Sequence, residues 1–143
     1  MASECEFPKD NAPTEEIAEI LRTARTIAVI GASLKPERPA HWISVYLKEQ
    51  GYKVIPVNPG QTEVLGDKCY KSLSEVPEPV DIVDIFREPS AIPAIVDEAI
   101  AKKAKAIWMQ QGIVHNAAAE KAKGAGLKVV QNKCIYQEHQ RLG

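Results

Sequence analysis

Several features that mark other classes of protein are absent from this sequence. No apolar run approaches the roughly 20 residues of a membrane-spanning helix, and residues 1–13 are acidic and polar, unlike a secretory signal. The cysteines, Cys5, Cys69 and Cys134, are odd in number and lack Cys-x-x-Cys spacing, so neither a disulfide framework nor a zinc site is indicated. We expect a cytoplasmic protein with reduced thiols, no membrane partner and a flexible segment at residues 1–13.

An excess of charge of one sign is also absent. The chain has 18 Lys and Arg against 19 Asp and Glu, a net charge of -1, so no overall field attracts nucleic acid. Any anion site must therefore be local. A length of 143 residues with 45% apolar residues is typical of one compact domain, and no repeat or linker divides the chain. We expect a single domain over residues 1–143.

Short β-branched runs alternate with stretches of helical periodicity. The patterns predict strands at 26–30, 52–57, 80–86, 104–109 and 127–135, and helices at 14–24, 41–51, 92–103 and 115–124. Thr14 is expected to cap the first helix and Gly51 to end the second. Residues 64–77 suggest a short edge strand and a helical turn. This alternation predicts an α/β fold with a mostly parallel sheet flanked by helices.

Ligands of such sheets bind beyond the carboxyl ends of the strands, which directs attention to the loop after residue 30. Gly31-Ala32-Ser33 leads from a strand toward a helix, an arrangement whose N–H groups can bind phosphate. Only one glycine of the G-x-G-x-x-G pattern is present, so a simple tight turn stays an open alternative. Lys35 and Arg38, on the same proline-containing loop, are either phosphate ligands or solvated surface charges.

The end of the second strand argues against a nicotinamide dinucleotide. Such a site presents Asp or Glu there to hold the ribose hydroxyls, whereas this chain has Val57-Asn58-Pro59. An NAD(P)-dependent oxidoreductase is therefore the least favoured reading.

Several blocks of sequence together resemble one family. GAS-x-KPERPA after the first strand, VNP after the second, VDIVDIFR and WMQQG occur in an order and spacing similar to the bacterial and archaeal CoA-binding protein family. That family is in turn similar to the N-terminal CoA-binding domain of the succinyl-CoA synthetase α subunit. The resemblance covers about residues 14–138. It implies a Rossmann-like three-layer sandwich and coenzyme A, or an acyl-CoA, as the ligand.

The resemblance also implies a role for particular residues. The phosphates would be bound by Gly31, Ala32, Ser33, Lys35 and Arg38, and the nucleotide would lie beside Asn58 and Pro59. The adenine would contact Phe86, Arg87 and Ile92. The pantetheine arm would contact Gln110, Gln111 and Gly112. The residues by themselves leave other readings open. Phe86 also fits a core position, Arg87 an ion pair with Glu88, and Gln110 a polar strand end.

No catalytic or metal-binding residue is indicated. Cys134 could meet the thiol of CoA, but no His or carboxylate in the sequence stands out as its base, so we expect a buried core thiol. The favoured function is a non-catalytic CoA carrier, sensor or regulatory module, with its protein partner left open. The alternative is a component of an acyl-CoA ligase or another enzyme that uses acyl-CoA. In the similar synthetase the active-site histidine lies in a second domain, which this sequence does not contain.

Overall fold

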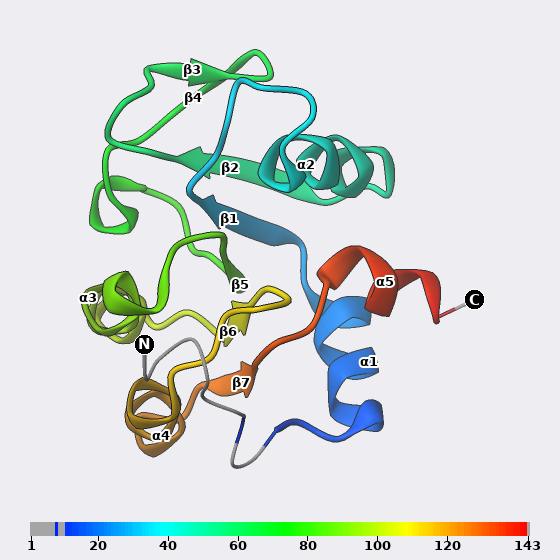
Figure 1. Ribbon diagram of the computed structural model, residues 1–143, viewed down its shortest axis with the longest axis vertical. Coiled ribbons are helices and arrows are strands. Elements are labelled where there is room, and N and C mark those ends of the chain that lie inside the picture. Colours follow the sequence, from blue (N-terminus) through cyan, green and yellow to red (C-terminus); the bar gives the residue numbers. More distant parts are fainter. Residues whose placement is uncertain (1–7, 9–10, 143) are drawn as a thin grey trace.

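A five-stranded parallel sheet forms the centre of the molecule (Figure 1). The computed structural model describes residue 8 and residues 11–142, so most of the segment expected to be flexible, including Cys5, lies outside the described residues. In spatial order the strands are β2 (Lys53–Val57), β1 (Thr26–Ile30), β5 (Ile82–Ile85), β6 (Ala106–Met109) and β7 (Lys128–Val130). Every neighbouring pair is parallel, which confirms the predicted class of fold.

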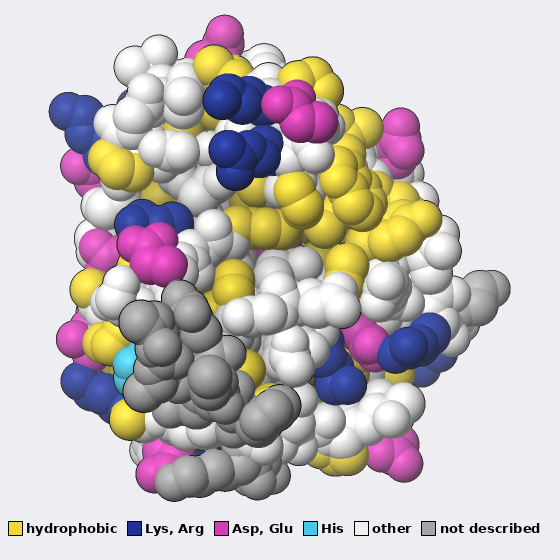
Figure 2. All heavy atoms as spheres, in the orientation of Figure 1, with side chains coloured by type: hydrophobic (Ala, Val, Ile, Leu, Met, Phe, Trp, Pro, Cys, Tyr) yellow, Lys and Arg dark blue, Asp and Glu magenta, His cyan; other side chains and the backbone are white. Residues whose placement is uncertain are grey.

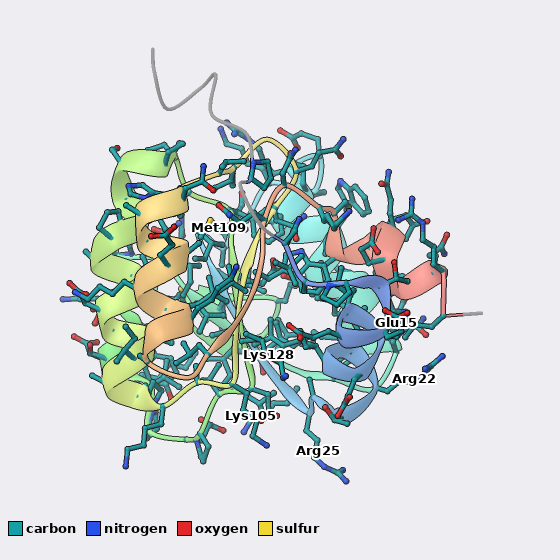
Figure 3. The ribbon with its side chains drawn as sticks, turned by 90° about the horizontal axis from the view of Figure 1, so that it is seen from below. Glu15, Arg22, Arg25, Lys105, Met109 and Lys128 are labelled. Atoms are coloured by element: carbon teal, nitrogen blue, oxygen red, sulfur yellow. The ribbon has the colours of Figure 1, made fainter. Side chains whose placement is uncertain are left out.

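Helices cover both faces of this sheet, giving the expected three-layer, Rossmann-like sandwich. One face carries α3 (Ile92–Lys102) and α4 (Asn116–Gly124); the other carries α1 (Thr14–Thr23), α2 (Pro39–Glu49) and α5 (Ile135–Gln140). Figure 3 shows the three layers from below, with Lys105 and Met109 at the two ends of β6. None of the described helices is both long and apolar enough to cross a membrane.

Alternate strand residues supply the two hydrophobic layers. In β1, Ile27 and Val29 pack under α1, α2 and α5, whereas Ala28 and Ile30 pack toward α3 and α4. All four are buried, as expected for a strand covered on both faces. The short β-branched runs of the sequence are therefore the central strands of this sheet.

The start and end of α2 fix the loop between it and β1. Pro39 occupies the first helical turn, where its missing N–H costs nothing. Gly51, with φ of 99°, follows the helix and turns the chain into β2, as predicted. Ile43 and Leu47 are buried against the sheet. The loop of residues 31–38 is thus held between two fixed elements at the carboxyl edge of the sheet.

The C-terminal region differs from the prediction. The expected strand 127–135 ends at Val130, and the helix α5, which was not predicted, begins at Ile135. Asn132 adopts a positive φ of 57°, and its Oδ1 accepts a hydrogen bond from the Gly112 N–H at 2.7 Å. The strand prediction was wrong here because this turn redirects the chain after three strand residues.

Residues 64–77 were expected to form a short edge strand and a helical turn. β3 (Glu63–Val64) and β4 (Asp67–Lys68) form a separate antiparallel pair, but Tyr70 makes a single parallel bridge with Val57 at the edge of β2. The expected turn is the 3₁₀ helix Leu73–Glu75. One smaller prediction also needs correction. Thr14 is the first residue of α1 and not its cap. Pro13 occupies the capping position, and no side-chain hydrogen bond caps this helix.

One carboxyl group is buried at the centre of the sheet. Asp84 of β5 is fully buried, lies in register with Val29 on one side and Trp108 on the other, and neither of its oxygens has a hydrogen-bond partner among the described residues. Burial raises the pKa of Asp84 well above its usual value, because the charged form would be desolvated. Burial at this position therefore favours the neutral form of the carboxyl over the charged form.

Candidate functional site

The candidate site lies where the strand order reverses. From β1 the chain passes to β2 on one side and then returns to β5 on the other, so the carboxyl ends of β1 and β5 flank the switch point. The Phe86 N–H, just after β5, donates to the Ile30 carbonyl at 2.9 Å. The loops that begin at Gly31 and Phe86 consequently leave the sheet side by side.

Three pockets open along this edge. The loop pocket, of about 330 Å³, is lined by Gly31, Ala32, Ser33, Lys35, Arg38, Pro39, Ala40, Asn58, Gln61 and Phe86. The edge pocket, of about 370 Å³, is lined by Ile30, Gly31, Val57, Asn58, Pro59, Lys71, Ser72, Leu73, Arg87, Ile95 and Glu98. The apolar pocket, of about 480 Å³, is lined by Pro39, Trp42, Ile43, Phe86, Gln110, Gln111, Ile113, Cys134, Tyr136 and Gln137.

Shared walls join the three pockets into one groove. The loop pocket shares Gly31 and Asn58 with the edge pocket, and it shares Pro39 and Phe86 with the apolar pocket. Figure 2 shows basic side chains beside a broad hydrophobic surface over α2 and α5. The groove therefore offers a charged centre with an apolar extension, which suits an elongated ligand that is anionic in one part and apolar in another.

Gly31 is required by the close approach of two loops. Its φ is 95°, and a Cβ atom at this position would lie 2.9 Å from the Phe86 carbonyl oxygen. Any side chain would push the loop after β1 away from the segment after β5. The single glycine of the motif is therefore explained by the backbone alone, as the tight-turn reading proposed.

The hydrogen bonds of this loop correct part of the phosphate-loop expectation. The N–H groups of Gly31 and Ala32 donate to the Val57 carbonyl at 2.9 and 3.2 Å and are not free for a ligand. In contrast, the N–H groups of Ser33 and of Ala40, in the first turn of α2, have no acceptor among the described residues. The groups open to an anion lie further along the loop than the sequence indicated.

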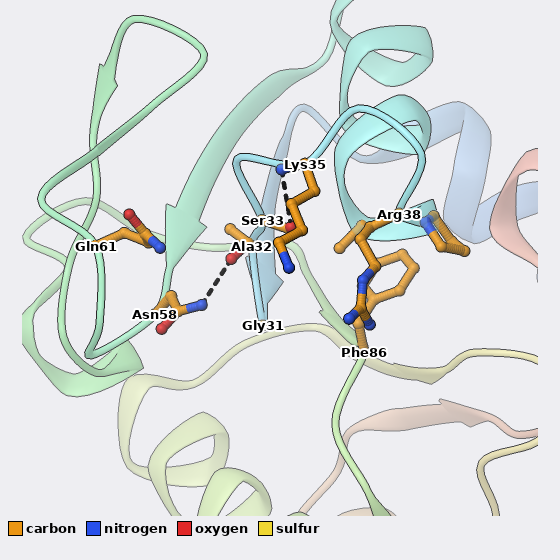
Figure 4. Close-up of a pocket in the computed structure, with 10 residues that line it drawn as sticks. Gly31, Ala32, Ser33, Lys35, Arg38, Asn58, Gln61 and Phe86 are labelled. Carbon is orange, nitrogen blue, oxygen red and sulfur yellow. Dashed lines mark hydrogen bonds between the residues drawn. The ribbon is translucent and has the colours of Figure 1, made fainter.

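Lys35 and Arg38 supply the positive charge of the loop pocket. Both side chains are exposed, and neither has a carboxylate partner among the residues that the structure describes. Figure 4 shows them extending from the loop into the pocket, with the Ser33 hydroxyl accepting a hydrogen bond from the Lys35 N–H at 3.1 Å. Two unpaired cations and free N–H groups can together bind a phosphate or diphosphate.

The side chain of Asn58 connects two loops of the site through hydrogen bonds. Its Nδ2 donates to the Ala32 carbonyl at 2.7 Å (Figure 4). Its Oδ1 accepts from the Gly60 N–H at 2.8 Å. An aspartate at this position could not donate to Ala32. The amide therefore ties the loop after β1 to the turn after β2, and it does not present a carboxylate to a ribose.

The edge pocket contains the remaining charged groups. Arg87 lines it and donates two hydrogen bonds of 3.1 Å to Glu88. The alternative that Arg87 forms an ion pair with Glu88 is therefore confirmed. These bonds hold the pKa of Glu88 below its usual value. Phe86 lines the loop pocket and the apolar pocket but not the edge pocket. Phe86 and Arg87, both expected to contact the adenine, therefore line different pockets.

Two of the expected site residues do not line the groove. Ile92 is fully buried in the core beneath α3 and has no surface that a ligand can reach in this conformation. Gly112 turns the chain after β6 with a φ of 89°, and its N–H is used by Asn132. Their neighbours Gln110 and Gln111 do line the apolar pocket.

The apolar pocket is the part of the groove that sequence reasoning largely missed. Trp42, 40% exposed, packs edge-on against Tyr136 with ring centroids 5.2 Å apart. Cys134, expected in the core, is only partly buried and lines this pocket. The wall is assembled from α2, the loop after β6 and α5, and α5 was itself not predicted. An exposed Trp directly after the basic loop was the one available signal.

The fold defines an α/β protein of the Rossmann-like class, and comparisons with known proteins agree with it. Residues 25–140 match a family model described as a CoA binding domain. The chain belongs to this family of CoA-binding domain proteins.

Its relatives include both single-domain proteins and parts of larger enzymes. The chain is 39% identical over 129 residues to the uncharacterized protein YneT of Bacillus subtilis, covering 90% of this chain and 96% of that protein. A hypothetical protein from Pyrococcus horikoshii has a solved structure that is 45% identical, with a TM-score of 0.90, 96% of this chain covered and 98% of that one. An ADP-forming acetate–CoA ligase of Methanocaldococcus jannaschii is 28% identical over 119 residues, or 78% of this chain, which spans only 17% of the ligase.

Proposed function

We propose that this protein binds coenzyme A along the groove and serves as a non-catalytic carrier, sensor or regulatory module. The observation that carries the proposal is that the loop pocket and the apolar pocket lie next to each other and share Pro39 and Phe86 as lining residues. The loop pocket, with the unpaired Lys35 and Arg38, would take the phosphates. The edge pocket would take the nucleotide base, and the apolar pocket the pantetheine arm.

The composition of the groove favours binding over catalysis. Among the described residues, no histidine lines any of the three pockets, and Cys134 has no hydrogen-bonded base. Nucleophilic catalysis by this thiol would need such a base. The unpaired thiols of Cys69 and Cys134 are typical of a reducing compartment, and the proposal accordingly places the protein in the cytoplasm.

Calorimetry of the full chain with CoA, acetyl-CoA and NADH tests the proposal. We expect CoA to bind at least tenfold more tightly than NADH, about 1.4 kcal/mol, because Asn58 is engaged with Ala32 and Gly60 and offers no carboxylate to a ribose. Equal or reversed affinities would refute the proposal. Lys121→Ala is the control for net charge, because it removes an exposed cation that pairs with Asp97 and lines none of the three pockets.

The relation to acetate–CoA ligases supports a second candidate, a separate component of an acyl-CoA ligase. In that case acyl-CoA would turn over only when a further protein supplied the catalytic residues. Incubation of the pure chain with acetyl-CoA, ADP and phosphate is expected to give no acetate or ATP. Turnover by this chain alone would contradict both candidates.

A further inference from the structure

The apolar pocket contains a thiol that the proposed function does not use. Cys134 lies where the chain leaves the loop after β7 and enters α5. Its side chain lines the pocket, is partly exposed, and has no hydrogen-bond partner among the described residues. A thiol held this way is open to a reagent that enters the groove.

A second group in the same pocket points independently to a ligand. Gln110 is 5% exposed, and its Oε1 accepts a hydrogen bond from the Ile135 N–H at 3.2 Å. Its Nε2 has no acceptor in the part of the chain that the structure describes, although the side chain lines the pocket. The side chain is almost fully buried, yet this nitrogen is not fully enclosed, so it can donate to an acceptor that enters the pocket, such as an amide carbonyl.

The other described cysteine provides a contrast. Cys69 is buried, and its Sγ lies 3.6 Å from the Asn58 carbonyl oxygen, to which it donates. Burial raises the pKa of this thiol, with the Asn58 hydrogen bond opposing the shift. Cys69 is therefore shielded from reagents, whereas Cys134 is accessible from the groove.

We propose that Cys134 is a modification site that forms a mixed disulfide with the thiol end of CoA. The proposal rests on the proposed function, since it needs the phosphates anchored at Lys35 and Arg38 and the amide-bearing arm beside Gln110. The arm of CoA ends in a sulfur, and Cys134 is one of the residues that line the pocket proposed to receive it. The result is CoA retained covalently, and so a CoA site that responds to oxidation.

The reagent is CoA disulfide, and the step is a thiol–disulfide exchange. The Cys134 thiolate attacks one sulfur of the CoA disulfide, the CoA S–S bond breaks, and a new bond joins Cys134 Sγ to one CoA sulfur. The other CoA leaves as a thiolate and takes up a proton, matching the proton that Cys134 lost. The Cys134 sulfur is oxidised and the departing CoA sulfur is reduced. A second thiol reverses the reaction.

Two disulfide reagents test this inference on the full chain. The protein is incubated with CoA disulfide or with 2-hydroxyethyl disulfide, which lacks the nucleotide, and adducts are located by mass spectrometry of peptides. We expect the CoA adduct on Cys134 to form at least about tenfold faster than the hydroxyethyl adduct, because binding holds the reacting sulfurs together. The Lys35→Ala/Arg38→Ala variant should slow only the CoA reaction. Cys69→Ala, the matched control, should change neither rate.

The outcomes separate the inference from the function on which it rests. Equal rates for the two reagents, or CoA adducts mainly on Cys5 or Cys69, would overturn the inference. Calorimetry with free CoA under reducing conditions is done in parallel on the parent protein. If CoA binds there but Cys134 stays unmodified by CoA disulfide, the inference fails and the proposed function stands. If CoA does not bind, the proposed function fails as well.

Discussion

The buried carboxyl of Asp84 makes a quantitative prediction about stability and pH. In the unfolded chain this group ionises near 3.8, whereas burial raises its pKa well above that value in the native protein. Between these two values the folded state carries one proton more than the unfolded state. The free energy of unfolding should therefore fall as pH rises, by up to about 1.4 kcal/mol per pH unit from this group alone.

Asp84→Asn isolates this contribution, since the amide has a similar shape and does not titrate. The free energy of unfolding of each protein is measured by urea denaturation across pH. From pH 4.5 to 6.5 the variant should gain stability relative to the parent, by at most about 1.4 kcal/mol per pH unit, because only the parent releases a proton on unfolding. Contributions from all other groups cancel in the difference. A difference that stays constant over this range would refute the assignment of Asp84 as a buried neutral acid.

Asp81 offers a control of opposite sign. Burial opposes its ionisation, but hydrogen bonds from the N–H groups of Arg25 and Thr26, together with Lys105, outweigh burial and lower its pKa below 3.8. Its contribution to stability is therefore present above the unfolded pKa and is lost as pH falls through the native value. Asp81→Asn should remove stability at neutral pH and have less effect in acid.

Three further predictions concern the groove. Gly31→Val should lower the free energy of unfolding by about 1–3 kcal/mol, measured by denaturation, because its Cβ would lie too close to the Phe86 carbonyl oxygen. The same variant should abolish CoA binding, measured by calorimetry. Lys35→Ala and Arg38→Ala should each weaken CoA binding by roughly 1–3 kcal/mol and flatten its dependence on salt, as seen by titration at several ionic strengths. Asn58→Asp should destabilise the fold by about 1–2 kcal/mol and weaken CoA binding, since a carboxylate replaces the donor to Ala32 and repels phosphate.

The sequence predicted the central sheet well because each strand has a local signature. Residues 26–30 and 106–109 are short apolar runs between polar or glycine-rich segments, and both are strands buried on two faces. The loop pocket was also predictable, since Gly31, Lys35 and Arg38 lie within eight consecutive residues. A site built from one loop can be recognised from local sequence.

The apolar pocket was predicted only in part, for the opposite reason. The family resemblance implied Phe86, Gln110 and Gln111, which line it. Trp42, Cys134 and Tyr136 come from other segments of the chain, and only the tertiary fold brings them to the same pocket. The six residues of α5 are too few for a helical period to be recognised. The burial of Asp84 could not be predicted from the sequence either. A carboxylate in a strand is expected to face solvent, and only the fold shows that helices cover both faces of this sheet.

The distribution of ion pairs explains how a chain of nearly zero net charge can hold a polyanion. Several cations elsewhere have carboxylate partners, as Lys48 has Asp67 and Lys121 has Asp97. Lys35 and Arg38 have no such partner in the described part of the chain, and they lie on the loop that also carries the free N–H of Ser33. Positive potential is therefore concentrated at this edge of the sheet without raising the charge of the protein. Increasing salt should therefore weaken CoA binding through these two residues, while exchanging charges in the remote pairs should leave it unchanged.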